Sequence, residues 1–489
     1  MRQYPLANNV PLSTWQTPVL PGMVFNTKQN KVNWNIPANI AMPQNKNDLA
    51  FYSVLQLASL IKNKKISSVE LTRFFIDRLK KFGDSLQCII SLTEDIAMQQ
   101  AAEADKEIAA GHYRGPLHGI PYGLKDLFAV KGTKTTWGAA PYKDQMIDED
   151  AYVYTKLKEA GGVLVAKFTL GALAMGDYWY GGRTKNPWNL KRGSSGSSAG
   201  STAATVAGLV PFAIGTETLG SIISPSTQCG ATGLRPTFGS ISRSGAMALS
   251  YSLDKIGPIC RSAEDAAVAF YYLHGTDGKD QAAVNMPFNY TGKADLSKLK
   301  IAYAKNYFDK IKDTAASEFK VLDVYRKLGA QLIPVDFPDS TVYNFDIVGI
   351  IISAECAAQF DDFTRSELDD MMTRQGKNDW PNQFRSARFI PAVEYINAYR
   401  HRYLLMQKVN AVISQYDVFI CPTGAGNQLA ITNLTGHPAL CFPTGFNKNK
   451  LPTNITLIGN LYSEATLLAV AKAYQDATDF NKQHPELFK

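Results

Sequence analysis

Two short segments rich in glycine and serine, 193–201 and 215–221, contain the residues best suited to nucleophilic chemistry. The first runs directly into 202–210, a stretch with the composition of a buried helix. Serines in front of such a helix can cap it, and their backbone N–H groups then point at whatever lies above the helix. A flexible linker has a similar composition, but a linker is not expected to continue into a buried helix. We therefore predict a functional loop at 193–201.

The second segment follows an apolar run, 210–214, that is typical of a strand end. Ser221 comes directly after Gly220, and glycine allows the backbone to approach a substrate closely. Successive N–H groups at such a turn could hold a developing oxyanion. An ordinary glycine-rich turn explains this segment equally well.

Lys125 is the third residue of chemical interest, because it is the only charged residue from 115 to 125. Most lysines are solvated surface groups. A lysine removed from water loses its proton more easily and can act as a base. The apolar, glycine-flanked surroundings of Lys125 favour that second interpretation.

Residues 196–200 also match the pattern G-x-S-x-G of a nucleophile elbow. The elbow requires a strong strand immediately before it, whereas the preceding residues, 186–192, are polar and interrupted by proline. The sequence therefore argues against an elbow.

The elements that would position these residues alternate between strands and helices. A capping box at Ser67 and Glu70 begins a helix. Further helices are expected from 93, from about 150, and over 314–328 and 464–480; strands are expected at 163–168, 300–304, 331–335, 417–421 and 454–458. This alternation predicts an α/β fold with a mostly parallel or mixed central sheet and helices on its faces.

Residues 1–50 have a different character, with six of the 24 prolines and nine asparagines. Such a composition favours extended segments and turns over helix, so we predict an N-terminal extended arm. Trp15, Phe25 and Trp34 favour an arm that docks on the body over a disordered tail.

The composition excludes several classes of protein. Apolar residues make up 45% and charged residues 19% of the 489, which is typical of a globular protein. The net charge of +8 is spread without a basic tract, so no nucleic-acid partner is expected. The six cysteines form no CxxC pair and the six histidines no metal motif, so buried free thiols and no metal are expected. The longest apolar stretch, 203–214, is too short to span a membrane. The compartment stays open: a soluble protein, cytoplasmic or exported with its signal removed.

Several motifs, in order along the chain, resemble those of the amidase signature family. They are Pro121 to Asp126, Gly193-Ser194-Ser195-Gly196, Gly220-Ser221-Ile222, Cys229 to Thr237, Leu253 to Pro258, Ser262 to Ala267, Phe389 to Tyr395, Gly436 to Ala439, and Leu457 to Gly459. The likeness covers roughly 50–480 and implies one large α/β domain, 51–489, with a mixed sheet covered by helices on both faces.

The resemblance also implies a Ser-cisSer-Lys triad that works without a metal or cofactor. Lys125 matches its base, Ser194 its bridging serine in a cis peptide, and Ser221 its nucleophile. The oxyanion hole would be formed by backbone N–H groups of Thr218, Leu219, Gly220 and Ser221. The implied activity is hydrolysis of a small linear, aryl or peptide-type amide through an acyl-enzyme on Ser221, by a monomer or homodimer. Substrate contacts are expected at Met175, Gly176, Asp177 and Tyr178.

The chain departs from the family pattern at several positions. Glu217 stands where the family has Asp, Leu219 where it has Gly, and Ile223 where it has Arg; Ser197, Asn454 and Thr456 also differ. Two other functions therefore remain open. One is the amidase-like subunit of a tRNA-dependent amidotransferase, which handles ammonia derived from glutamine; the extra arm and residues 219 and 223 fit that role poorly. The other is a non-enzymatic binding protein on the same fold.

Overall fold

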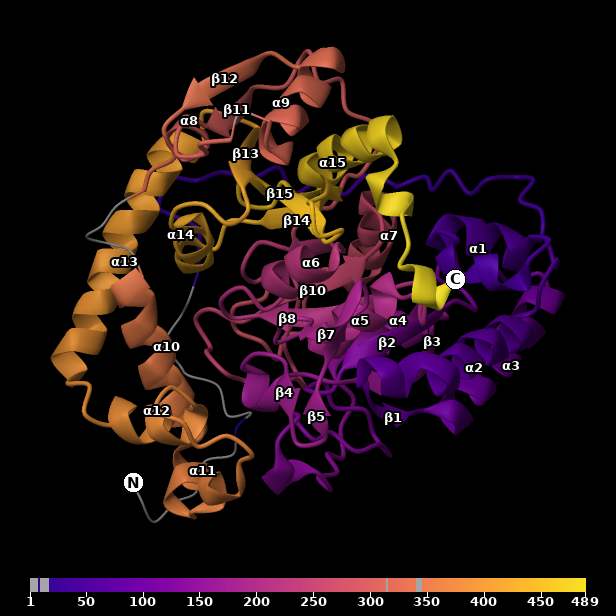
Figure 1. The fold of residues 1–489 in the computed structure, drawn as a ribbon, viewed down its shortest axis with the longest axis horizontal. Coiled ribbons are helices and arrows are strands. Elements are labelled where there is room, and N and C mark those ends of the chain that lie inside the picture. The colour runs from indigo at the N-terminus through magenta and orange to yellow at the C-terminus, as the bar shows by residue number, and fades with distance from the viewer. Residues whose placement is uncertain (1–7, 9–16, 314, 340–344) are drawn as a thin grey trace.

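An eleven-stranded mixed sheet forms the centre of the molecule (Figure 1). The computed structural model describes residues 8, 17–313, 315–339 and 345–489. The order of the strands is β1-β3-β2-β8-β10-β9-β14-β15-β13-β11-β12. These strands are β1 (Ile89–Leu92), β2 (Pro121–Lys125), β3 (Val163–Phe168), β8 (Ala213–Glu217), β9 (Thr232–Arg235), β10 (Lys255–Cys260), β11 (Ile301–Ala304), β12 (Leu332–Val335), β13 (Val418–Pro422), β14 (Ala439–Phe446) and β15 (Pro452–Gly459). Two small hairpins lie outside the sheet: β4 (Tyr178–Trp179) with β5 (Gly182–Arg183), and β6 (Lys185–Asn186) with β7 (Asn189–Gly193).

Helices lie between many of the strands in the described chain. They are α1 (Val54–Lys62), α2 (Ser68–Leu86), α3 (Glu94–Ala109), α4 (Tyr152–Glu159), α5 (Ala199–Val206), α6 (Ile223–Cys229), α7 (Ala263–Leu273), α8 (Lys305–Phe308), α9 (Ser317–Lys327), α10 (Phe345–Gln359), α11 (Asp361–Arg365), α12 (Trp380–Ala387), α13 (Ala392–Ile413), α14 (Gln428–Thr435) and α15 (Glu464–Thr478). Helices α10 to α13 gather on the side of the molecule opposite α1 to α3 (Figure 1).

The sheet is buried on both faces, as the first three side chains of β3 indicate. Val163 and Val165 pack with α2, α3 and α5, whereas Leu164 packs in the larger core that contains α4 and α7. Because successive side chains of a strand point to opposite faces, these two cores lie on opposite sides of the sheet. The single large α/β domain with helices on both faces is therefore confirmed.

The functional residues lie at one edge of the sheet. Strand β2 pairs in parallel with both β3 and β8. The carboxyl ends of parallel strands meet at the same edge, so Lys125 at the end of β2 and Glu217 at the end of β8 emerge together. Strand β10 runs antiparallel to β8 with Lys255 opposite Glu217, which brings the residues before β10 to the same edge.

The predicted elements agree with the structure, with shifted ends. Strand 163–168 is β3, and Ser67 caps α2 through a capping box with Glu70. The predicted helix at 202–210 begins earlier, at Ala199, and ends at Val206. Strand β8 extends to Glu217, so Gly215 and Thr216 belong to the strand rather than to the turn.

Parts of the N-terminal arm dock on the body. Trp34 stacks on Tyr290 and contacts Tyr271 edge-on, and Phe25 meets Tyr462 in the same edge-on manner. Trp15 lies outside the described residues, and the boundary at residue 50 stays a prediction. Among the described helices, none combines the length and the apolar character that crossing a membrane requires.

Candidate active site

Lys125 is completely buried at the end of β2, where hydroxyl groups surround its amine. Its Nζ lies 2.7 Å from Ser197 Oγ, 2.8 Å from Thr216 Oγ1 and 3.2 Å from Ser198 Oγ. Burial lowers the pKa of Lys125 to about 7, against the opposing influence of the Asp254 and Glu217 carboxylates. A lysine in this setting is neutral in a large fraction of molecules near neutral pH and can accept a proton.

The predicted bridging serine, Ser194, is wrong in position. Its hydroxyl donates to the Ser195 carbonyl at 2.8 Å, and Lys125 instead contacts Ser197. A cis peptide bond was expected at Ser194, but the structure has it between Gly196 and Ser197. The predicted loop 193–201, called the serine loop from here on, contains two Gly-Ser-Ser repeats, starting at 193 and 196, and only the second contacts the lysine. The one distinguishing signal in the sequence is that the second repeat directly precedes the helix.

The serine loop also holds the segment that carries Ser221. The backbone N–H of Ser198 donates to the Ser221 carbonyl at 3.1 Å, and its hydroxyl donates to the Thr216 carbonyl at 3.0 Å. Ser198 is the central serine of the G-x-S-x-G match, and the strand before it, β7, belongs to a hairpin outside the main sheet. The absence of a central strand there agrees with the prediction against an elbow. Ser221 itself is 8% exposed.

The turn from Thr218 to Ser221 has the backbone that an oxyanion hole needs. Within the described chain, no protein group accepts a hydrogen bond from the backbone N–H groups of residues 218–221. Gly220 has φ +83°, and a Cβ there would come within 2.7 Å of Ser224 Oγ. Leu219, which replaces a family glycine, keeps its N–H and packs its side chain on an apolar cluster. The predicted oxyanion hole is compatible with this geometry and stays a prediction.

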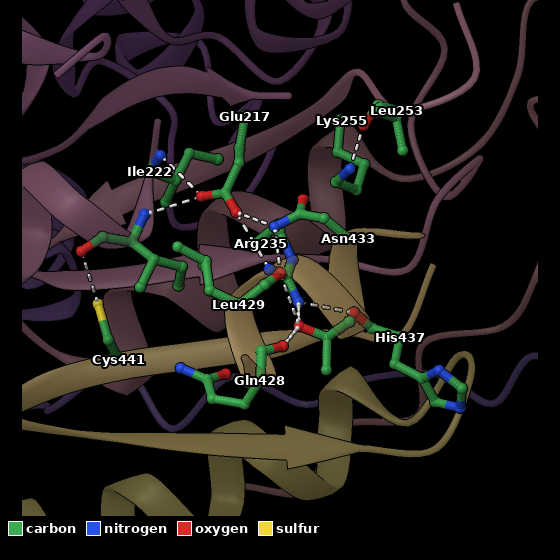
Figure 2. Close-up of polar contacts among 12 residues, drawn as sticks. Glu217, Ile222, Arg235, Leu253, Lys255, Gln428, Leu429, Asn433, His437 and Cys441 are labelled. Atoms are coloured by element: carbon green, nitrogen blue, oxygen red, sulfur yellow. Dashed lines mark hydrogen bonds and ion pairs between the residues drawn. The ribbon is translucent and has the colours of Figure 1, made fainter. Parts of the chain in front are cut away.

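Glu217 braces the residues that follow Ser221 (Figure 2). One carboxylate oxygen accepts from the N–H groups of Ile222 and Ile223, both at 2.9 Å. The other is 3.0 Å from Arg235 Nη1 and 2.9 Å from Asn433 Nδ2. Burial alone would raise the pKa of Glu217, but Arg235, the Ile223 N–H and Asn433 together lower it. A charged Glu217 therefore ties the start of α6 to β9 and α14.

Because both partners of this ion pair are fully buried, Arg235→Met is expected to destabilise the protein strongly. The variant leaves the Glu217 carboxylate buried without its counter-charge, which costs about 3–5 kcal/mol. Arg326→Met is the matched control, since Arg326 and its partner Asp323 are 50% and 63% exposed, and about 1 kcal/mol or less is expected. Denaturant unfolding measures the free energy of unfolding of both variants. Equal losses of stability in the two would contradict this account.

A cavity of about 280 Å³ lies beside Lys125. Thr216, which contacts the lysine, lines it, as do Thr218 and Asp254. Its apolar walls come from Ala174 and from residues 246–249. The volume is at the lower limit for ligand pockets, so a small substrate group fits. Residues 243–256 supply most of the wall. Of these, 253–256 fall within the motif Leu253 to Pro258, and no pattern in the sequence marks the others as a pocket.

The four predicted substrate residues do not come together in this cavity. Their neighbour Ala174 lines it, whereas Gly176 and Asp177 line a separate cleft with Arg183, and Tyr178 lines a third. Gly176 nevertheless covers the serine loop, because a Cβ on Gly196 would lie 1.9 Å from the Gly176 carbonyl. Substrate contacts at Met175 to Tyr178 stay a prediction.

The cysteines and histidines provide no alternative chemistry at this site. All six cysteines are free and buried, as predicted. In the described residues, no three His, Cys, Asp or Glu side chains gather closely enough to hold a metal ion. His437 is buried, its pKa is lowered to about 3 by burial and by Arg235, and its ring contacts the Thr435 hydroxyl.

Comparison with known proteins identifies the relatives of this arrangement. The model of the family described as Amidase matches residues 70–468. A glutamyl-tRNA(Gln) amidotransferase subunit from Coxiella burnetii is 34% identical over 89% of this chain and 99% of its own. The corresponding subunit from Methylococcus capsulatus is 33% identical over 88% of this chain and 98% of its own.

Solved structures place the fold in the same group. The peptide amidase of Stenotrophomonas maltophilia superimposes with a TM-score of 0.81 and 27% identity, over 90% of this chain and 99% of its own. A bacterial aryl acylamidase of the amidase signature family, 23% identical, shares the fold with a TM-score of 0.79 over 88% of this chain and 97% of its own. Sequence motifs, family match and fold agree, and the chain belongs to the amidase signature family.

Proposed function

We propose that this protein hydrolyses the C–N bond of a small amide through an acyl-enzyme on Ser221. The observation that carries the proposal is the buried amine of Lys125, held by the hydroxyl groups of Ser197 and Thr216. A serine hydroxyl is a poor nucleophile unless a nearby base takes its proton. Lys125 supplies that base, and its contact with Ser197 supplies the path toward the loop of Ser221.

The proposed reaction has the following steps. Neutral Lys125 takes a proton from Ser197, which takes one from Ser221 as its Oγ attacks the carbonyl carbon. The N–H groups of the 218–221 turn stabilise the resulting oxyanion. When the C–N bond breaks, the proton returns through Ser197 to the nitrogen, and the amine leaves. Water, deprotonated along the same path, attacks the ester, and the acid leaves as Ser221 regains its proton.

Two measurements test this proposal. A fluorophosphonate probe reacts with activated serines, so labelling at Ser221, located by peptide mass spectrometry, is expected. A panel of aryl, aliphatic and peptide amides and carbamates, assayed for released amine, then identifies the substrate class. A folded protein that neither labels nor turns over any amide would instead support the non-enzymatic binding protein.

The pH dependence of kcat/KM is expected to report on Lys125. Only the neutral amine can accept a proton, so activity should rise with pH through about 7 and level off above it. This limb lies close to the ordinary value of a histidine, about 6.5, so its position alone does not identify the base. The variants His437→Gln and His401→Gln test the histidine alternative; His437 itself, with a pKa of about 3, is already neutral throughout this range. A limb that disappears in either variant would contradict the lysine mechanism.

The curated relatives favour a second candidate, the glutamine-hydrolysing subunit of a tRNA-dependent amidotransferase. Their 34% identity extends over 89% of this chain, and their names describe one subunit of a larger enzyme. In that role glutamine would be the substrate that acylates Ser221, and the released ammonia would pass to a partner. Assays of the isolated chain separate the two candidates. Turnover of aryl or aliphatic amides without a partner supports the amidase, whereas glutamine hydrolysis that requires a co-purifying subunit supports the amidotransferase.

A further inference from the structure

We propose that Asp254 is a positioning residue for the reaction: its carboxylate fixes the Thr218 hydroxyl, and with it the turn that leads to Ser221, from the wall of the cavity beside Lys125. The proposal rests on the proposed function, since it assigns a role within the same acyl-transfer site. Asp254 lies within the motif Leu253 to Pro258, but it is not among the triad, oxyanion or pocket residues that the resemblance implies.

The contact with Thr218 is direct and short. Thr218 Oγ1 donates to Asp254 Oδ1 at 2.6 Å, a distance typical of a hydroxyl that donates to a charged carboxylate. Thr218 begins the turn whose backbone N–H groups would face the oxyanion. A hydrogen bond to its side chain can therefore fix the direction of that turn.

Asp254 is itself anchored by its own loop. Its second oxygen, Oδ2, accepts from the backbone N–H groups of Leu249 and Ser250, at 2.8 and 2.9 Å. That loop is held from outside by Glu355 of α10, which accepts from the Ser250 hydroxyl and, at 3.1 Å, from the Ser252 N–H. With three donors fixed on it, the Asp254 carboxylate cannot turn away from Thr218 without breaking other hydrogen bonds.

Helix α13 holds Glu355 in place. Tyr395 and Tyr399 of α13 donate their hydroxyl groups to its other oxygen, Oε1. A continuous series of hydrogen bonds therefore runs from α13 through Glu355, the loop 249–254 and Asp254 to Thr218. The long helices α10 and α13 thus support the turn that carries the nucleophile.

The charge of Asp254 also acts on Lys125. Together with Glu217 it favours the protonated amine and so opposes the effect of burial on the pKa of Lys125. The basic groups that face Asp254 are Arg243, which is paired with Asp280, and Lys255, whose amine donates to the Leu253 carbonyl and whose pKa burial lowers well below its ordinary value. Removing the negative charge of Asp254 is therefore expected to lower the pKa of Lys125.

These two effects can be measured separately. In Thr218→Val the hydroxyl is lost while the charge of Asp254 stays, so kcat should fall about tenfold or more, as for a misdirected oxyanion donor, with the pH limb unmoved. Thr218→Ser keeps the hydroxyl and should restore most of the rate. Asp254→Asn should lower kcat and also move the rising limb of kcat/KM to lower pH.

The matched control is Asp265→Asn, because Asp265 is a buried carboxylate on α7 that accepts from the Val54 N–H, in another part of the protein. It can lower stability but should leave the limb in place. The proposal is overturned if Thr218→Val is as active as Thr218→Ser, or if folded Asp254→Asn keeps the rate and pH profile of the parent. Fluorophosphonate labelling of the parent protein separates this failure from failure of the proposed function, which would abolish labelling in every variant.

Discussion

Replacing Ser221 with alanine is expected to abolish amide hydrolysis. The Oγ atom of Ser221 is the proposed nucleophile, and without it no acyl-enzyme can form. The loss in kcat should be on the order of 10⁴-fold or more, as for a triad nucleophile whose binding site stays intact. Fluorophosphonate labelling should disappear in the same variant, and mass spectrometry of a peptide containing residue 221 measures this directly.

Stability should change little in Ser221→Ala, because a single hydroxyl contributes little packing energy. Ser226→Ala is the matched control, since Ser226 lies on the following helix α6 and packs against Gly233. It should keep both labelling and turnover. Substantial amide hydrolysis by Ser221→Ala would refute the assignment and direct attention to Ser198, the central serine of the G-x-S-x-G match.

Most of the fold could be predicted from the sequence because its signals are local. The buried strand β3 is a mostly apolar run that directly follows two glycines, and the capping box of α2 is a short pattern that marks a helix start. Helices α10 to α13 carry no comparably clear signal. The continuous apolar run at 347–352 is compatible with either a strand or a buried helix, and only tertiary packing decides between them.

The candidate site was predictable only in part, for a different reason. Lys125 and Ser221 stand in distinctive sequence contexts. In the structure the serine loop contacts both, through Ser197 and Ser198. Asp254 stands within the motif Leu253 to Pro258, but its contact with Thr218 gave no signal, because Thr218 is 36 residues away and becomes a neighbour only through the pairing of β10 with β8. The sequence shows Glu217 where the family has an aspartate. It does not show that Glu217 forms a buried ion pair with Arg235.

The second large effect on kcat is expected at Ser197, the serine of the loop that contacts Lys125. Ser197→Ala and Lys125→Ala are each expected to lower kcat by about 10³-fold or more, since each interrupts the proposed path of the proton from Ser221 to the base. Ser194→Ala should retain most of the activity, because the Ser194 hydroxyl contacts the Ser195 carbonyl and not the lysine. Both serines follow a glycine and precede a serine, so this pair of variants compares two nearly identical positions.

The double variant Lys125→Ala/Ser197→Ala separates a relay from two independent contributions. If the proton passes from Ser221 through Ser197 to Lys125, removing either residue already breaks the path, so the double variant should be scarcely slower than the slower single variant. Steady-state kcat values for the parent, the two single variants and the double variant complete the comparison. Losses that multiply would mean that the two residues act separately, and a Ser194→Ala variant as inactive as Ser197→Ala would place the relay at the first Gly-Ser-Ser repeat instead of the second.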